Sequence, residues 1–133
     1  MTNIEIVKEK LYGTNASLVV LYANGECKEY YQNRIKDIKE ILQNDKNALR
    51  DAVIADKVIG KVASSILTVA GVKEIYADVM SKYAIPVLEE NQIQYEYQNL
   101  VEYVQNDDKT GMCPMENKYK DEKDIDKIYK EML

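Results

Sequence analysis

The chain has 133 residues, of which 46% are hydrophobic and 31% are charged, and its net charge is −5. This length and composition predict a single globular domain over residues 1–133. The chain has no histidine and only two cysteines, which excludes histidine-based catalysis and the usual zinc-cysteine sites. The acidic charge argues against nucleic acid and anionic membranes as partners, because both attract basic patches.

The first residues lack the basic and apolar regions of a signal peptide, and no apolar run approaches the roughly 18 residues that span a bilayer. We therefore expect a cytoplasmic protein with no membrane partner. Cys27 and Cys113 are expected to remain free thiols in that reducing compartment.

The chain opens with a predicted helix and a predicted hairpin. Residues 3–12 place apolar side chains along one stripe with charges opposite, which is typical of an amphipathic helix. Residues 17–23 and 26–32 have the composition of two strands. They are joined by Asn24 and Gly25, a pair that favours a type I′ turn because both of its central residues need positive φ.

Helices and strands alternate after the hairpin. We predict helices at residues 34–43, 58–72, 82–90 and 123–132, and strands at residues 48–55, 74–80 and 93–97. Such alternation requires right-handed crossovers and a largely parallel sheet that is covered on both faces. The fold class is therefore α/β, with a three-layer α/β/α architecture whose mixed sheet begins with an antiparallel hairpin.

The first candidate site follows the strand at residues 48–55. Asp56 is placed to cap the next helix, and Lys57 and Lys61 would lie one turn apart at its beginning. Gly60 in a first helical turn suggests close approach by a ligand or by the sheet. Because a helix N-terminus binds anions, these residues predict an anion site. The alternative is an ordinary cap, a packing glycine and two solvated lysines.

The second candidate site is the stretch of residues 106–116, which begins at Asn106. Pro114 suits the first position of a helix, so Cys113 and Glu116 would both lie at that helix start. A thiol and a carboxyl group in this arrangement could act as nucleophile and proton carrier, with a lysine such as Lys57 replacing the usual histidine. The alternative is a small buried side chain beside a carboxylate that favours the helix dipole.

Other motifs of known chemistry are absent from the chain. It contains no glycine-rich phosphate loop, no nucleophile elbow and no metal-ligand spacing. No cofactor and no metal site are therefore expected.

Three segments together resemble an uncharacterised prokaryotic family that is catalogued as a domain of unknown function. They are residues 55–61 (Ala-Asp-Lys-Val-Ile-Gly-Lys), 77–81 (Ala-Asp-Val-Met-Ser) and 110–116 (Thr-Gly-Met-Cys-Pro-Met-Glu). The resemblance implies a cytidine deaminase-like fold and brings no known reaction with it.

A zinc deaminase takes its metal ligands and its catalytic glutamate from two neighbouring helix starts. In the implied fold these starts fall near residues 34–37 and 56–61, and neither stretch contains cysteine or histidine. Zinc hydrolysis by that route is therefore excluded.

Our first functional hypothesis is a zinc-free domain that binds a small anionic ligand, such as a nucleotide or a phosphorylated metabolite. Its predicted ligand-binding residues are Asp56, Lys57, Gly60, Lys61, Asn106, Cys113 and Glu116. Whether it is an enzyme stays open, and the candidates for catalysis are Cys113, Glu116 and Lys57. The alternative is a non-catalytic protein-interaction module, for instance a homodimer, in which the same motifs attach a loop to the sheet. Recognition of structured RNA is a third reading, which the acidic charge disfavours.

Overall fold

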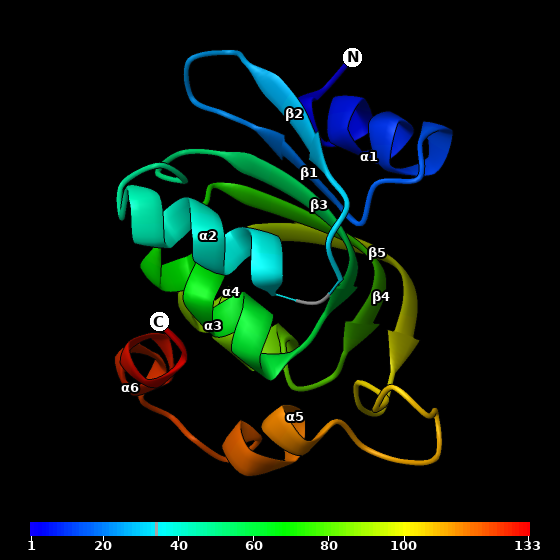
Figure 1. The fold of residues 1–133 in the computed structure, drawn as a ribbon, viewed down its shortest axis with the longest axis vertical. Coiled ribbons are helices and arrows are strands. Elements are labelled where there is room, and N and C mark those ends of the chain that lie inside the picture. The colour runs from blue at the N-terminus through cyan, green and yellow to red at the C-terminus, as the bar shows by residue number, and fades with distance from the viewer. Residues whose placement is uncertain (34) are drawn as a thin grey trace.

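The computed structural model describes residues 1–33 and 35–133 (Figure 1). In chain order its elements are α1 (Asn3–Gly13), β1 (Leu18–Leu21), β2 (Cys27–Tyr30), α2 (Lys36–Asn44), β3 (Val53–Ile59), α3 (Lys61–Val69), β4 (Glu74–Ser81), α4 (Ile85–Glu90), β5 (Gln94–Val101), α5 (Pro114–Tyr119) and α6 (Ile125–Met132). The order of helices and strands agrees with the sequence prediction. Arg34, the first residue of the predicted second helix, lies outside the described residues.

One five-stranded sheet forms the middle layer, with the strand order β2-β1-β3-β4-β5. Strand β1 pairs antiparallel with both β2 and β3, whereas β3, β4 and β5 are parallel to one another. The predicted mixed sheet with an initial hairpin is thus confirmed. Because the parallel strands all end at the same edge, the segments that follow β3, β4 and β5 emerge together.

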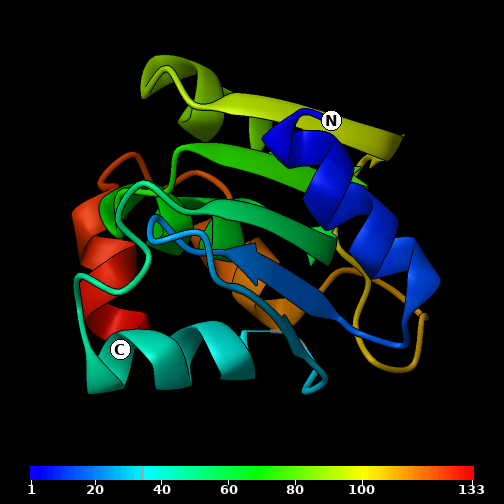
Figure 2. The same ribbon diagram turned by 90° about the horizontal axis from the view of Figure 1, so that it is seen from above.

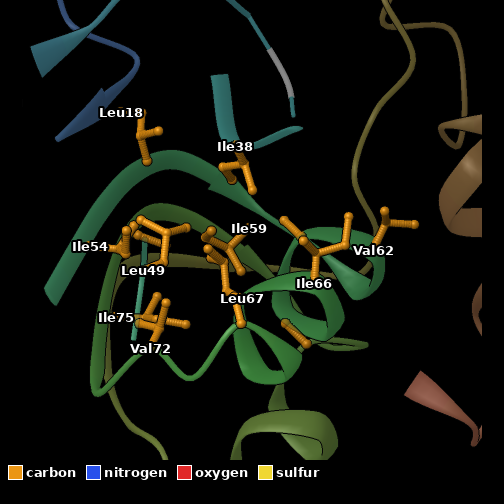
Figure 3. Packing of buried hydrophobic residues seen from close by; sticks show 14 of the residues in the cluster. Leu18, Ile38, Leu49, Ile54, Ile59, Val62, Ile66, Leu67, Val72 and Ile75 are labelled. Atoms are coloured by element: carbon orange, nitrogen blue, oxygen red, sulfur yellow. The ribbon is translucent and has the colours of Figure 1, made fainter. Parts of the chain in front are cut away.

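Helix α1 lies on one face of this sheet and the other helices lie on the opposite face (Figure 2). The α1 side has a small core in which Ile4, Val7 and Leu11 pack against strand residues. The other side has the larger core, shown in Figure 3, in which Ile38 of α2, Ile66 of α3 and Ile54 of β3 belong to one buried cluster. The three-layer α/β/α prediction is therefore confirmed. No helix in the described part of the chain combines the length and the apolar character needed to cross a membrane.

The hairpin turn differs from the predicted type. Gly25 has a φ of 93°, but Asn24 is not among the residues with positive φ, so a type I′ turn is wrong. Gly25 N–H donates to Tyr22 O at 2.9 Å, and Tyr22 N–H donates to Glu26 O at 2.8 Å. The loop is therefore one residue longer than a two-residue turn, and only its last position needs the left-handed conformation that glycine tolerates.

The largest boundary error concerns β3, which was predicted at residues 48–55. The observed strand begins at Val53 and continues to Ile59, so the following helix begins at Lys61 rather than at residue 58. Strand β3 is paired on both sides: Asp56 lies opposite Leu18 of β1, and Ile59 lies opposite Met80 of β4. These two neighbours keep the chain extended past the point at which its apolar run ends.

Candidate functional site

A pocket of about 480 Å³ opens beyond the carboxyl end of β3. This volume is within the range of small-molecule sites, and the position is where open α/β sheets bind their ligands. The wall is formed by β3, the starts of α2, α3 and α5, the segment after β5, the residue before β1, and one residue of α6. The lining residues are Ser17, Asn33, Ile35, Asp56, Lys57, Val58, Gly60, Val62, Ala63, Val104, Gln105, Asn106, Asp107, Lys109, Cys113, Met115, Glu116 and Met132.

The two predicted candidate stretches meet in this pocket. Asp56, Lys57 and Gly60 come from the first stretch, and Asn106, Cys113 and Glu116 come from the second. Lys61 is the one predicted site residue that does not line the pocket. The convergence is a property of the fold. Strands β3, β4 and β5 are parallel and end at the same edge of the sheet, so the end of β3 and the segment that follows β5 both lie at that edge.

Asp56 is not a helix cap, contrary to the sequence prediction. It lies within β3 and is 7% exposed, and its Oδ1 accepts a hydrogen bond from Val58 N–H at 3.2 Å. The residue at the cap position of α3 is Gly60, which has no side chain with which to cap. Asp56 therefore presents a buried carboxyl group to the pocket from the middle of the domain.

Burial raises the pKa of Asp56 from its ordinary value to about 7. Hydrogen bonds from the backbone of Val58 and Lys57 act in the opposite direction, and the nearby charge of Asp37 raises the pKa further. Asp37 is itself buried, and its carboxyl group accepts hydrogen bonds from the backbone N–H and the side-chain amide of Gln32. The pocket wall thus contains a carboxyl group that exchanges a proton near neutral pH, a property common in functional sites.

Lys57 lies on β3 with its side chain exposed, and its backbone N–H donates to Ser17 O at 3.1 Å. It is therefore not one helical turn from Lys61, and that prediction is wrong. Lys61 is the first residue of α3 and is 8% exposed. Burial lowers its pKa, while the acidic groups of Asp121, Glu122 and Glu90 raise it. The Lys61 side chain thus lies among acidic residues of α4 and of the connection between α5 and α6, and its predicted ligand-binding role has no support from the pocket geometry.

Glu116 connects three parts of the pocket wall. It is 2% exposed, and its Oε1 accepts a hydrogen bond from Lys61 N–H at 2.6 Å. Its Oε2 accepts one from Val104 N–H, also at 2.6 Å. One carboxyl group therefore attaches the start of α5 both to the start of α3 and to the segment that follows β5. The predicted anion site at this helix start is filled by a carboxyl group of the chain itself.

Gly60 is required by this connection. A Cβ atom at position 60 would lie 2.5 Å from Val104 Cγ2 and 2.6 Å from Glu116 Oε1. The φ of Gly60 is −119°, so its conformation is open to other residues and the constraint is space alone. The close approach anticipated from the sequence is therefore made by Glu116 and Val104.

We expect Gly60→Ala to lower the free energy of unfolding by about 1–2 kcal/mol, since the added methyl group must push Val104 and Glu116 apart. Chemical denaturation measures the loss. Gly13→Ala is the matched control, because nothing lies within 4 Å of a Cβ at that position. Equal stability of Gly60→Ala and the wild type would contradict the close packing of Glu116 on this glycine.

A short hairpin carries the second candidate stretch. Gln105 pairs with Met112, and Cys113 N–H donates to Val104 O at 2.7 Å. Asn106 closes its loop, since its side-chain oxygen accepts from Thr110 N–H and its amide donates to the Thr110 hydroxyl. Both polar groups of the Asn106 side chain are therefore engaged within the loop, which makes Asn106 a positioning residue for the pocket rim.

Cys113 precedes α5, as predicted, and Pro114 is the first residue of that helix. Cys113 is 8% exposed and lines the pocket. Neither Cys113 nor Cys27 is part of a disulfide. The nucleophilic role suggested for Cys113 stays a prediction.

Sequence reasoning missed Lys109 and the apolar part of the wall. Lys109 lies in the loop of the short hairpin with a φ of 57°, and no periodic pattern marks it. Val62 belongs to α3, Val104 to the segment after β5 and Met132 to α6. Each of them looks like an ordinary core residue in its own segment, so only the assembled fold could identify this group. No three cysteine, aspartate or glutamate side chains of the described chain are arranged to hold a metal ion.

The fold and the pocket together define the class of this protein: an α/β/α domain with a mixed five-stranded sheet and a pocket at the carboxyl end of a parallel strand. A model of one protein family matches residues 6–133, nearly the whole chain. The chain belongs to this family, which is described as TM1506, a domain of unknown function (DUF1893).

A solved structure has the same fold. It is the crystal structure of a DUF1893 family protein (TM1506) from Thermotoga maritima, which is 25% identical in sequence. The match has a TM-score of 0.87 and covers 100% of this chain and 90% of the other. A comparison with curated proteins gave no match. The predicted membership of a family of unknown function is therefore confirmed.

Proposed function

We propose that the pocket at the end of β3 binds a small anionic ligand, such as a nucleotide or a phosphorylated metabolite. The observation that carries the proposal is the convergence of the two candidate stretches on one pocket of about 480 Å³. Such a volume accommodates a small molecule, and a largely apolar wall with a few polar groups is typical of ligand sites.

Two lysine side chains supply the positive charge that an anionic ligand needs. Lys57 and Lys109 both line the pocket and both are exposed. Neither forms an ion pair with another residue in the described part of the chain. The backbone N–H of Lys61 is already bonded to Glu116, so anion recognition would depend on lysine side chains rather than on the dipole of α3.

The apolar wall would hold the uncharged part of the same ligand. Ile35, Val62, Val104 and Met115 contribute aliphatic and thioether surface. Burying such surface against a ring or chain contributes roughly 25 cal/mol per Å². Asp56 lies on the same wall, where it could exchange a hydrogen bond with the ligand in either protonation state.

We retain the cytidine deaminase-like comparison as part of this proposal, without its metal. The two helix starts that would supply zinc ligands hold Lys36 and Asp37 in α2, and Gly60 and Lys61 in α3. Zinc sites of deaminases use histidine and cysteine there. The residues present do not fit zinc, so no catalytic step is assigned to a metal.

A catalytic version of the proposal would use Cys113 or Lys57. Glu116, the third predicted candidate, has both of its oxygen atoms bonded to backbone N–H groups, which makes it a positioning residue. Asp56 takes its place as the carboxyl group suited to carry a proton, since its pKa of about 7 is close to neutral pH.

The binding experiment uses a thermal-shift screen with nucleoside phosphates, sugar phosphates and inorganic phosphate, followed by calorimetry on any hit. We expect Lys57→Ala and Lys109→Ala each to weaken binding about tenfold or more, because each removes a charged contact to the ligand. Lys73→Ala is the matched control, since Lys73 is exposed and precedes β4 at the opposite end of the parallel strands. A panel without any hit, or a hit whose affinity is unchanged by both pocket variants, would overturn the proposal.

The alternative function is a non-catalytic interaction module. The bonds of Glu116 to Lys61 and Val104 support it, because they attach the start of α5 to the start of α3 and to the segment after β5, which is a purely structural role. In that case Lys57→Ala would leave every interaction of the protein unchanged, and Glu116→Ala would lower stability alone. The same calorimetric experiment therefore separates the two functions.

A further inference from the structure

The two edges of the sheet differ in their protection against pairing. Strand β2 exposes only four residues at its edge, Cys27–Tyr30, and two of them, Lys28 and Glu29, are charged. Strand β5 exposes eight residues, Gln94–Val101, of which Glu96 alone is charged, and it contains neither lysine nor proline. Short strands, lysine and proline are the features by which proteins block edge-to-edge association. The β5 edge has none of them.

Part of the β5 backbone turns its N–H and C=O groups outward at this edge, where no neighbouring strand of the described chain pairs with them. Lys82 N–H donates to Val101 O at 2.9 Å, which shows that Val101 is turned toward β4. Residues alternate in direction along a strand, so the even-numbered residues of β5 turn their N–H and C=O groups outward. These residues are Gln94, Glu96, Gln98 and Leu100. No other backbone segment of the described chain pairs with them.

Apolar side chains are also exposed along β5. Leu100 is 48% exposed and Tyr97 is 40% exposed, and they lie on opposite faces of the strand. Figure 2 shows β5 as the outermost strand of the sheet, with the first turn of α1 beside it. A partner strand at this edge would cover apolar surface on both faces of β5 as well as satisfying its backbone.

We propose that the β5 edge pairs antiparallel with the β5 edge of a second copy of this chain, joining the two sheets into one. This inference goes beyond ligand binding and does not depend on it. In an antiparallel pair, two residues that face each other have their side chains on the same face of the sheet. Side chains alternate between faces along a strand, so the two-fold axis that relates the copies must pass beside a residue rather than between two residues. Centring on Tyr97 or on Gln98 gives the longest overlap. Centring on Tyr97 would make the Glu96 side chains of the two copies diagonal neighbours, whereas centring on Gln98 keeps these like charges apart, so Gln98 is the preferred centre.

The charges of the strand suit this register. Gln98 then faces Gln98 of the second copy, and Glu96 faces Leu100 of the second copy, so the two glutamates are never opposite each other. Like charges placed directly opposite would weaken a strand pair. About six cross-strand hydrogen bonds form between the outward-turned residues. Glu96 is thus the one charged residue that each β5 strand brings to the contact.

The experiment is sedimentation velocity of the full chain over a range of concentrations up to roughly 100 μM. We expect the wild type to approach twice its 15.3 kDa mass. Gln98→Pro should be monomeric, because the lost N–H points outward and the ring blocks the edge. Gln98→Lys should weaken the dimer roughly fivefold to tenfold by placing like charges opposite each other. Mixing it with Gln98→Glu should restore association.

Two controls show whether a change in dimer formation is caused by the β5 edge. Thermal unfolding of each variant checks that it is folded, and if Gln98→Pro is not, the Gln98→Lys and Gln98→Glu pair decides the question. Gln43→Lys adds the same charge at an exposed position of α2 and should leave the dimer unchanged. A monomeric wild type across the whole concentration range would overturn the proposal. So would a dimer that persists unchanged in folded Gln98 variants.

Discussion

Glu116→Ala is expected to lower the free energy of unfolding by about 3–4 kcal/mol. The substitution removes the acceptors of two backbone N–H groups, those of Lys61 and Val104, at a position that is 2% exposed. Each N–H group then loses its partner inside the protein, and a cavity replaces the side chain. Urea denaturation followed by circular dichroism measures the change.

Glu116→Gln separates the hydrogen bonds from the packing. The glutamine side chain has nearly the same shape, but it presents one acceptor oxygen and one N–H₂ group to two N–H donors. We expect it to lose about half as much stability as Glu116→Ala. Equal stability of all three proteins would contradict the assignment of Glu116 as the connection between α3, α5 and the segment after β5.

Asp56→Asn is expected to change how stability depends on pH. In the wild type the folded-state pKa of Asp56 is raised to about 7, above its ordinary value of 3.8, so the folded protein binds this proton more tightly than the unfolded chain. Between these two values stability falls as pH rises, because folding then requires a proton that the unfolded chain has released. The loss attributable to Asp56 between pH ~5.5 and pH ~8 is about 2 kcal/mol.

Asparagine has the same shape, keeps an acceptor for Val58 N–H and carries no charge. The difference in unfolding free energy between Asp56→Asn and the wild type should therefore be small at acidic pH and should grow in favour of the variant up to about pH 7, and then level off. Denaturation of both proteins across this range measures it. Asp78→Asn is the control, since Asp78 is only partly buried on β4. A difference for Asp56→Asn that is independent of pH would show that the carboxyl group is ionised throughout.

The two substitutions also separate stability from binding. Glu116 bonds only to the backbone, so its loss should loosen the pocket wall as a whole. Asp56 lies on the wall as a side chain available to a ligand, so its replacement should change affinity while leaving the wall in place. A ligand found in the binding screen can therefore be tested against both variants.

Much of the fold could be predicted from local patterns. The apolar stripe of residues 3–12 predicted α1, and the alternation of strands and helices after the hairpin predicted three layers. Pro114 correctly marked the start of α5. These predictions succeeded because helix and strand periods are recorded in consecutive residues, and layers follow from the need to cover both faces of a parallel sheet.

Six of the seven predicted site residues line one pocket, but the structure gives several of them a different position or partner from the one predicted. Asp56 and Lys57 were placed at a helix start, yet they belong to a strand that continues to Ile59. Glu116 was expected to carry protons, yet it bonds to backbone groups of residues distant in the sequence. Such contacts leave no periodic trace in the chain.

The sequence by itself determined that the chain lacks histidine, that helices and strands alternate, and that two unusual stretches carry glycine, lysine, cysteine and carboxyl groups. The tertiary structure decided that these stretches share one pocket and that Asp56 is buried enough for its pKa to reach about 7. It also decided that Glu116 takes the anion position at α3. The physical reason is that burial and backbone partners depend on neighbouring strands and helices, whereas hydrophobic periodicity depends only on the segment that contains it.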